Sequence, residues 1–235
     1  GPAPVSVPNV VGLSQAAATT AITNAGLILG TVTTASSNTV PAGNVISESP
    51  VSGTLVNRGS SVSLVVSSGA APTVVSFKVL FGGQSYNVTG STRTRLPWQI
   101  TGIQVVFSKP ITTGGVASLS GVIVTGFGGL GTTTLNWSIN PVPQGNLAVA
   151  LSGSGPNALK DAAGNGLGGG AGFAQALKVL WGDFNDDGVV SAGDLIGVNN
   201  ATVSPYNIFA DMNGDGTVSV SDVQIVRARV GTSLP

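Results

Sequence analysis

The chain has 235 residues, of which 42% are hydrophobic and only 8% are charged, and a chain of this length forms two or three small domains more readily than one large core. It contains no cysteine, which excludes disulfides and thiolate metal sites, and no histidine, which excludes imidazole bases and histidine-ligated metals. Its 35 glycines and many β-branched residues favour turn-rich β modules over a helical bundle.

The formal net charge of zero hides a division between two parts of the chain. Residues 1–180 contain seven Lys or Arg residues and two acids, whereas residues 181–235 contain seven Asp and two Arg residues. The basic residues of the first part are thinly spread, which argues against nucleic-acid binding. The dense carboxylates of the second part predict a bound cation.

No apolar run is long enough to span a membrane, and no signal peptide is visible. We therefore expect no membrane insertion by these residues, and we interpret the chain as a piece of a longer protein.

The first predicted domain covers residues 3–69. Ser14 is positioned to cap a helix over residues 15–24, and Gly26 closes that helix. Strands are predicted at residues 27–33, 44–48 and 61–67. One helix against a three-stranded sheet makes a small α+β domain.

Short motifs follow one another in this domain: Val7-Pro8-Asn9-Val10-Val11-Gly12, Ala25-Gly26-Leu27, Gly43-Asn44-Val45-Ile46, Pro50, Gly53, Gly59 and Val62-Ser63-Leu64-Val65-Val66-Ser67. In this order they resemble the PASTA domain, which is best known from bacterial cell-wall enzymes and kinases. The resemblance implies either a spacer or a module that binds peptidoglycan fragments. The short, small-residue link at 67–72 is expected to be a semi-flexible joint.

The second predicted domain covers residues 73–180 and is an all-β sandwich. Alternating runs separated by Gly- and Pro-rich turns predict strands at 75–80, 99–107, 121–124, 133–139, 147–151 and 174–180. The segments at 103–111 and 159–165 resemble the bacterial Ig-like domains of surface and S-layer proteins. Trp98, Trp137 and Trp181 could form a sugar-binding platform, but scattered tryptophans are more often core residues.

The third segment, residues 181–235, contains a calcium-loop pattern twice. Calcium prefers six to eight oxygen ligands, which an EF-hand loop supplies from positions 1, 3, 5, 7, 9 and 12, with Gly at position 6. The predicted ligands in the first loop are Asp183, Asn185, Asp187, the Val189 carbonyl, Ser191 and Asp194. Those in the second loop are Asp211, Asn213, Asp215, the Thr217 carbonyl, Ser219 and Asp222. Two such loops, 28 residues apart, predict two bound Ca²⁺ ions.

Neither loop is expected to have the entering helix of a standard EF-hand, because a strand and turn at 176–182 precede the first one. Only exiting helices are predicted, one from about Leu195 to Asn200 and one around Val223 to Val230. Val190 and Val218, each at loop position eight, are expected to join the two loops into one small α-helical core. A core of about fifty residues is marginal by itself, so calcium binding is expected to couple to folding.

A loop followed by an exiting helix, repeated once, resembles the type I dockerin, a module that binds cohesin domains. The resemblance implies a partner-binding face at Ala192, Gly193, Asn199 and Asn200, or at Val220, Ser221, Arg227 and Ala228. Because the two sets differ, one docking orientation is favoured over two. The loops are closer together than is usual in cellulosomal dockerins, which implies a shortened helix between them.

Catalysis is not expected. Outside the third segment the only carboxylates are Glu48 and Asp161, which fall in different predicted domains, whereas a glycosidase needs two that flank one bond. No Ser-x-x-Lys sequence is present to activate a serine.

The sequence thus predicts a non-catalytic, extracellular, modular fragment that is mostly β. Its C-terminal calcium module is expected to dock to a cohesin-like partner. Two alternatives stay open: a structural stalk in which the calcium module only caps and rigidifies the sandwich, and peptidoglycan binding through the PASTA-like domain.

Overall fold

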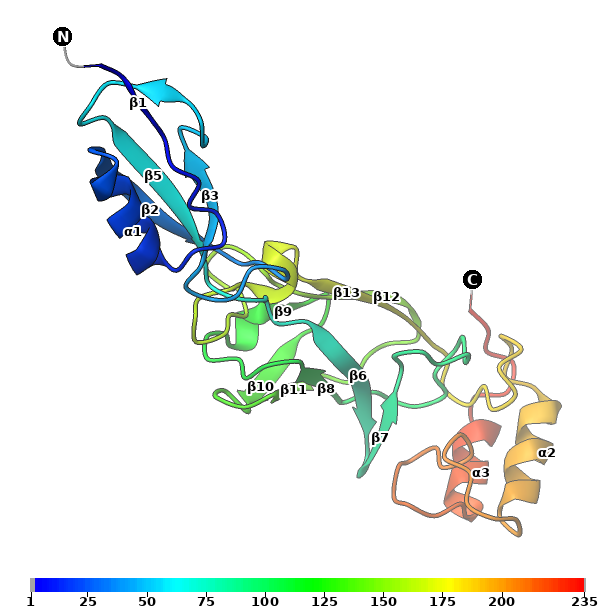
Figure 1. Ribbon diagram of the computed structural model, residues 1–235. Coiled ribbons are helices and arrows are strands. Elements are labelled where there is room, and N and C mark those ends of the chain that lie inside the picture. The colour runs from blue at the N-terminus through cyan, green and yellow to red at the C-terminus, as the bar shows by residue number, and fades with distance from the viewer. Residues whose placement is uncertain (1–2, 235) are drawn as a thin grey trace.

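The computed structural model describes residues 3–234, which form three units arranged end to end (Figure 1). The N-terminal unit contains β1 (Val5–Ser6), α1 (Gln15–Asn24), β2 (Ile28–Ala35), β3 (Val45–Ser49), β4 (Leu55–Val56) and β5 (Ser61–Ser67). The middle unit contains β6 (Val74–Phe81), β7 (Gln84–Asn87), β8 (Gly102–Phe107), η1 (Val116–Ser118), β9 (Leu119–Ser120), β10 (Val124–Gly128), β11 (Thr134–Ile139), β12 (Gly145–Leu151), η2 (Leu167–Gly170) and β13 (Phe173–Val179). The C-terminal unit contains α2 (Ala192–Ala201) and α3 (Val220–Arg227).

The mostly-β, multidomain fold class is confirmed. In the N-terminal unit α1 lies against a three-stranded sheet of order β2-β5-β3, in which β2 and β5 run parallel. The hydroxyl of Ser14 accepts a hydrogen bond from the backbone N–H of Ala17 at 3.3 Å, so the predicted cap is present at the predicted residue. Ala18 and Ile22 of α1 are buried against the sheet, which leaves the polar face of the helix in water.

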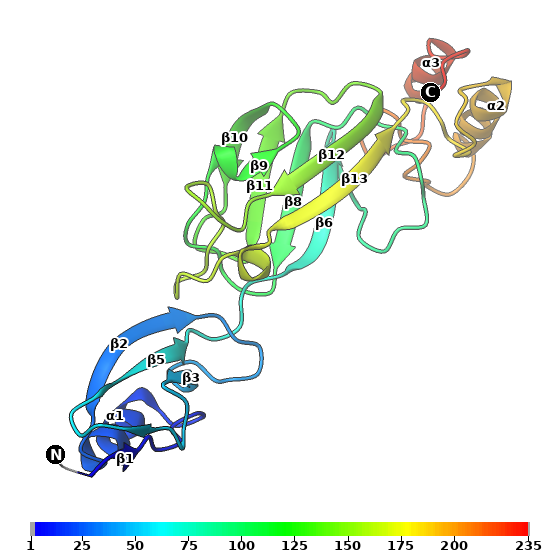
Figure 2. The same ribbon diagram turned by 90° about the horizontal axis from the view of Figure 1, so that it is seen from above.

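The middle unit is a β-sandwich. A five-stranded sheet of order β10-β11-β8-β6-β7 faces a three-stranded sheet of order β13-β12-β9, as Figure 2 shows. Five of the six predicted strands are present, but the one expected at 121–124 begins only at Val124, because the preceding residues form a bend. The short strands β7 and β9 were not predicted, since neither carries a long apolar alternation.

The tryptophans do not form a sugar-binding platform. Trp98 and Trp137 are completely buried in the sandwich core, and their indole N–H groups donate to the carbonyls of Ile208 and Gly115. Trp181 is half-buried, and the guanidinium of Arg229 covers its ring at 4.6 Å.

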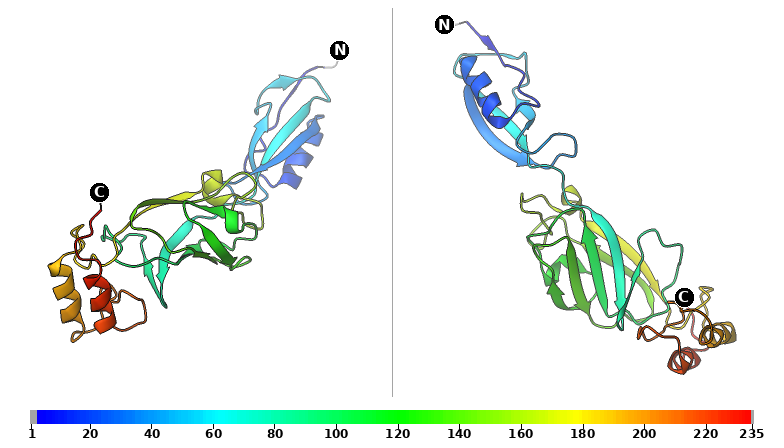
Figure 3. Two further views of the ribbon diagram at one scale, coloured as in Figure 1. Left: turned by 180° about the vertical axis from the view of Figure 1, so that it is seen from behind. Right: turned by 60° about the horizontal axis from the view of Figure 1, so that its bottom comes forward.

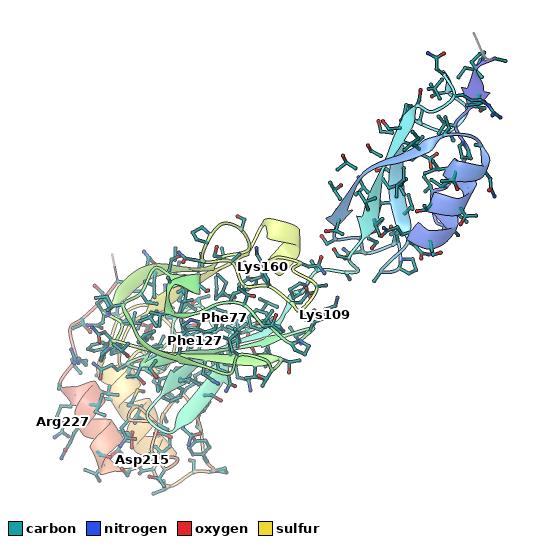
Figure 4. All side chains as sticks on the ribbon, turned by 90° about the vertical axis from the view of Figure 1, so that its left-hand side faces the viewer. Phe77, Lys109, Phe127, Lys160, Asp215 and Arg227 are labelled. Carbon is teal, nitrogen blue, oxygen red and sulfur yellow. The ribbon has the colours of Figure 1, made fainter. Side chains whose placement is uncertain are left out.

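The link between the first two units differs from the flexible joint that its composition predicts. The amide of Asn165 in the sandwich donates to the carbonyl of Ser68 at 3.1 Å and accepts from the Ser68 hydroxyl. Gly168 donates to the carbonyl of Pro72 at 2.9 Å, and Lys109 donates to the carbonyl of Ala70. Figure 4 shows Lys109 at the end of the sandwich that faces the N-terminal unit. These bonds hold the link at several points, which no local sequence pattern indicates.

No helix among residues 3–234 is long and apolar enough to cross a membrane.

Candidate metal centre

The two loops of the C-terminal unit have the backbone that the calcium pattern requires. Gly188 and Gly216, at position six, have φ values of 92° and 89°, a region that favours glycine. At position four, Asp186 and Gly214 also have positive φ, 66° and 70°. Asp tolerates this conformation better than most residues, so the two loops follow the same path with different side chains.

Each loop runs directly into its exiting helix through a reciprocal cap. Ser191 and Ser219 are the N-caps of α2 and α3, and Asp194 and Asp222 occupy the third helical position and accept from the N-cap backbone N–H. The helices therefore begin at the tenth loop position, directly after the cap and earlier than the sequence suggested. The recurring Ser-x-x-Asp was the signal for this start.

Four aspartates at the ends of the loops, Asp183, Asp194, Asp211 and Asp222, have no exposed surface. None of them lies within ion-pair distance of a Lys or Arg side chain in the described part of the chain. Backbone N–H groups surround them instead; Gly188 donates to Asp183 at 3.1 Å and Gly216 donates to Asp211 at 2.9 Å. A buried carboxylate without a cation is costly. These positions therefore fit a bound cation.

The burial of these groups also shifts the pKa values of two residues in the site. Burial raises the pKa of Asp183 above its ordinary value, and repulsion from Asp194 adds to this effect. Burial, the hydrogen bond to Asp211 and the charges of nearby carboxylates together raise the pKa of Tyr206 to about 12. Burial is the main cause of both pKa shifts, and the negative charge of neighbouring carboxylates adds to it.

The donor set is mixed rather than a cluster of acids. Among residues 3–234, no three carboxylates converge closely enough to hold a metal by themselves. An EF-hand-type loop adds amide, carbonyl and hydroxyl oxygens to its carboxylates, and this mixture suits calcium. The Asn185 amide nitrogen donates to Asp187 at 2.8 Å, and Asn213 and Asp215 make the same contact. The amide oxygen of each Asn accepts from the backbone N–H of that Asp, at 3.1 and 3.0 Å, and it has a second lone pair for an ion.

Sequence reasoning missed the groups that surround the loops. The phenol of Tyr206 donates to Asp211 at 2.9 Å. Arg93 of the sandwich donates to the carbonyls of Asp183 and Phe184. Two arginines within three residues, in a chain with so few charges, were the only local signal for this contact.

The loops and helices share one small core, to which Val190 and Val218 both belong. The eight residues predicted to face a partner, Ala192, Gly193, Asn199, Asn200, Val220, Ser221, Arg227 and Ala228, are all exposed. The structure adds two large apolar side chains that the sequence reasoning did not single out. Ile196 on α2 is 60% exposed, and Val203 just beyond the helix is 89% exposed.

The C-terminal unit packs against the end of the sandwich. Phe209, from the segment between α2 and loop two, stacks on Trp98 with ring centroids 5.5 Å apart, and Trp98 stacks on Phe81 at 4.0 Å. The guanidinium of Arg93 lies 4.3 Å from the centre of the Phe209 ring. Both helices nevertheless keep an exposed face, and Figures 1 and 3 place α2 farther from the sandwich than α3.

Each of the two loops buries its first and last aspartate and leads through a reciprocal cap directly into a helix. Residues 181–231 match the dockerin type I domain. These residues are a type I dockerin domain. Residues 5–68 match the PASTA domain, so the chain carries a PASTA domain, a β-sandwich and a dockerin in that order. Dockerin type I domains typically bind calcium, and both families are typical of extracellular or cell-surface proteins.

Two protein kinases are similar to this chain in its PASTA region only. A probable serine/threonine-protein kinase from Clostridium acetobutylicum is 41% identical over 64 residues, which cover 27% of this chain and 10% of the kinase. A probable serine/threonine-protein kinase from Corynebacterium efficiens is 40% identical over 81 residues, 34% of this chain and 12% of the kinase. The chain therefore matches only about a tenth of the length of these relatives. PASTA and dockerin domains are themselves non-catalytic.

Among solved structures, the three-PASTA-domain structure of a Ser/Thr kinase from Staphylococcus aureus is similar, with 30% identity and a TM-score of 0.29. The alignment covers 30% of this chain and 35% of that one. The extracellular region of the Ser/Thr kinase PrkC from Staphylococcus aureus is 20% identical with a TM-score of 0.26, over 45% of this chain and 47% of that one.

Proposed function

We propose that the dockerin binds two calcium ions and docks the chain to a cohesin-like domain of a partner protein outside the cell. The burial of four aspartates without a pairing cation is the observation that carries the calcium part. The proposed ligands of the first ion are Asp183, Asn185, Asp187, Val189 through its carbonyl, Ser191 and Asp194. Those of the second are Asp211, Asn213, Asp215, Thr217 through its carbonyl, Ser219 and Asp222.

The role of the two serines follows from their caps. Each serine hydroxyl accepts a hydrogen bond from the backbone N–H two residues later, Gly193 for Ser191 and Ser221 for Ser219. A hydroxyl that caps a helix is held near the loop, and it reaches an ion most readily through a water molecule. Calcium would thus fix the start of each helix, and the orientation of the helix faces depends on these starts.

For docking we favour the face of α2 over that of α3. Within α2 the only charged residue is Asp194, which is buried, so the exposed surface of this helix is neutral. Small residues at Ala192 and Gly193 permit close approach, and Ile196 and Val203 offer apolar area to a partner sheet. On α3 the exposed Arg227 adds a charge, and α3 is the helix nearer the sandwich.

The test is capture of a partner from the secreted and surface fraction of the source organism, with calcium and with chelator. Two matched variants separate the faces: Ile196→Asp on α2 and Val220→Asp on α3, where the native side chains are 60% and 67% exposed. We expect Ile196→Asp to abolish the capture of a cohesin-like domain, because a buried unpaired charge opposes docking, and Val220→Asp to retain it.

A control that combines Asp183→Ala with Asp211→Ala should lose capture in calcium. Capture that persists in chelator would contradict the calcium-dependent mechanism. Capture lost in Val220→Asp and kept in Ile196→Asp would contradict the choice of α2.

A second candidate, a structural cap on the sandwich, is favoured by the contact between the dockerin and Trp98. In that case no cohesin-like domain would be captured under any condition, although calcium would still stabilise the chain. For the PASTA domain, the family match supports peptidoglycan as a candidate ligand. Co-sedimentation of the chain with purified peptidoglycan, independent of calcium, would identify that activity.

A further inference from the structure

The fourth residue of each calcium loop contacts the sandwich. This residue is Asp186 in loop one and Gly214 in loop two, and both have positive φ. Neither is a predicted calcium ligand. The two loops therefore present equivalent, non-ligating positions to the same end of the sandwich, although their contacts use different chemistry.

In loop one the contact is charged. The carboxylate of Asp186 accepts hydrogen bonds from the backbone N–H and hydroxyl of Thr94 and from the backbone N–H of Arg95, all at 2.8 Å. The guanidinium of Arg95 pairs with it at 3.5 Å and donates to its backbone carbonyl at 2.9 Å. Such charge-assisted bonds are stronger than neutral ones.

In loop two the contact is made by backbone against backbone. Gly83, in the turn between β6 and β7, donates to the carbonyl of Gly214 at 2.7 Å. A Cβ atom on Gly82 would lie 2.1 Å from the carbonyl oxygen of Asn213, and one on Gly214 would lie 2.2 Å from that of Phe81. Only glycines allow the turn and the loop to approach so closely.

We infer that the end of the sandwich is a docking surface for both calcium loops, which holds them in their closed, ion-binding form. This inference rests on calcium binding by the dockerin, but not on a cohesin-like partner. A standard EF-hand braces each loop with an entering helix, which both loops here lack in the described structure. The segment at 93–95 and the turn at 82–83 take the place of those helices.

The energetic argument concerns the loop without its ion. Repulsion among its carboxylates favours an open loop, and an open loop loses its contacts with the sandwich. The contacts with the sandwich therefore stabilise the closed form of the loop and raise the fraction of molecules in which the ion-free loop is closed. Because only the closed form binds the ion, the calcium affinity rises by the same factor as this fraction. Coupling of this kind is reciprocal, so calcium must also stabilise the sandwich.

The test uses calcium titration calorimetry on the full chain and two matched pairs of variants. Gly82→Ala clashes with loop two, whereas Gly90→Ala places a Cβ in open space at a similarly positive φ, 73° against 52°. Thr94→Val removes the hydroxyl bond to Asp186, whereas Thr92→Val changes a neighbouring exposed threonine for which the structure shows no side-chain hydrogen bond. Thermal unfolding, followed by near-ultraviolet circular dichroism with calcium and with chelator, gives the reciprocal readout.

We expect Gly82→Ala to weaken one calcium site about tenfold or more, equivalent to about 1.4 kcal/mol. Thr94→Val should weaken the other site about threefold to tenfold, and the two control variants should bind like the wild type. The rise in the unfolding temperature of the sandwich on calcium addition should shrink in both test variants. If a substitution only destabilised the sandwich, it would lower the unfolding temperature equally with calcium and with chelator.

Equal calcium affinity in each test variant and its control would overturn the inference while leaving calcium-dependent docking intact. Loss of partner capture, with the affinity differences present, would contradict only the docking function. A wild-type chain that binds no calcium would overturn both.

Discussion

Replacing Asp222 by Asn tests whether its burial serves an ion. In the structure this carboxylate accepts from the backbone N–H groups of Met212, Asn213 and Ser219 and from the Ser219 hydroxyl, at 2.8–3.2 Å. An amide keeps one acceptor oxygen, so the substitution loses the bonds to the other oxygen. We expect this loss to cost about 1–2 kcal/mol of unfolding free energy in chelator, comparable to the removal of a helix cap.

Calcium should enlarge that cost. If the site has a Kd on the order of 1 μM, about 1 mM calcium stabilises the fold by about 4.1 kcal/mol. A hundredfold weaker site would retain only about 1.4 kcal/mol, so Asp222→Asn should lose about 2.7 kcal/mol more in calcium than in chelator. Urea unfolding followed by tryptophan fluorescence, in both conditions, measures this difference.

Asp161→Asn is the matched control. Asp161 is also buried, accepts from Ala163 and Asn165, and pairs with Lys109 at 3.6 Å, but it lies at the far end of the sandwich from the loops. Asp161→Asn should lower the free energy of unfolding by the same amount with and without calcium. An equal effect of calcium on Asp222→Asn and Asp161→Asn would refute the assignment of a calcium ion to loop two.

Two further predictions concern the surroundings of the loops. The pKa of Tyr206 is raised to about 12 from 10.0, so its neutral phenol stabilises the fold below pH 10 and this stabilisation is lost as the pH rises through about 12. Because positive charge favours the phenolate, calcium should lower this pKa; absorbance titration of the wild type against Tyr206→Phe would show no calcium effect if loop two binds no ion. Phe209→Ala removes the stack on Trp98 and the contact with Arg93, and should cost about 2–3 kcal/mol in urea unfolding. A loss below about 0.5 kcal/mol would mean that this contact does not hold the dockerin to the sandwich.

Local sequence patterns predicted the features of the fold that depend only on residues close together in the chain. The cap at Ser14 fixed the start of α1, and the glycines at position six of the loops required the turns that the structure contains. The missing entering helices were also predicted, because the apolar run before loop one alternates with period two. Strand ends shifted by a few residues, and α2 and α3 began earlier than expected because the serine caps were not recognised.

Contacts between distant residues could not be predicted in this way. Thr94 and Asp186 are separated by 92 positions, and Gly82 and Gly214 by more; nothing in either neighbourhood specifies the other. The hydrogen bonds that fix the link between the first two units at Ser68 likewise depend on Asn165, which lies 97 positions away.

Spacing within a dozen residues was therefore enough to predict the domain order, the loop backbones and the candidate ligands. The packing of the dockerin on the sandwich, with α2 as the outer helix, could not be predicted from such spacing. Hydrogen bonds, stacking and close glycine contacts between domains depend on how already formed surfaces fit together, and that fit leaves no periodicity in the chain.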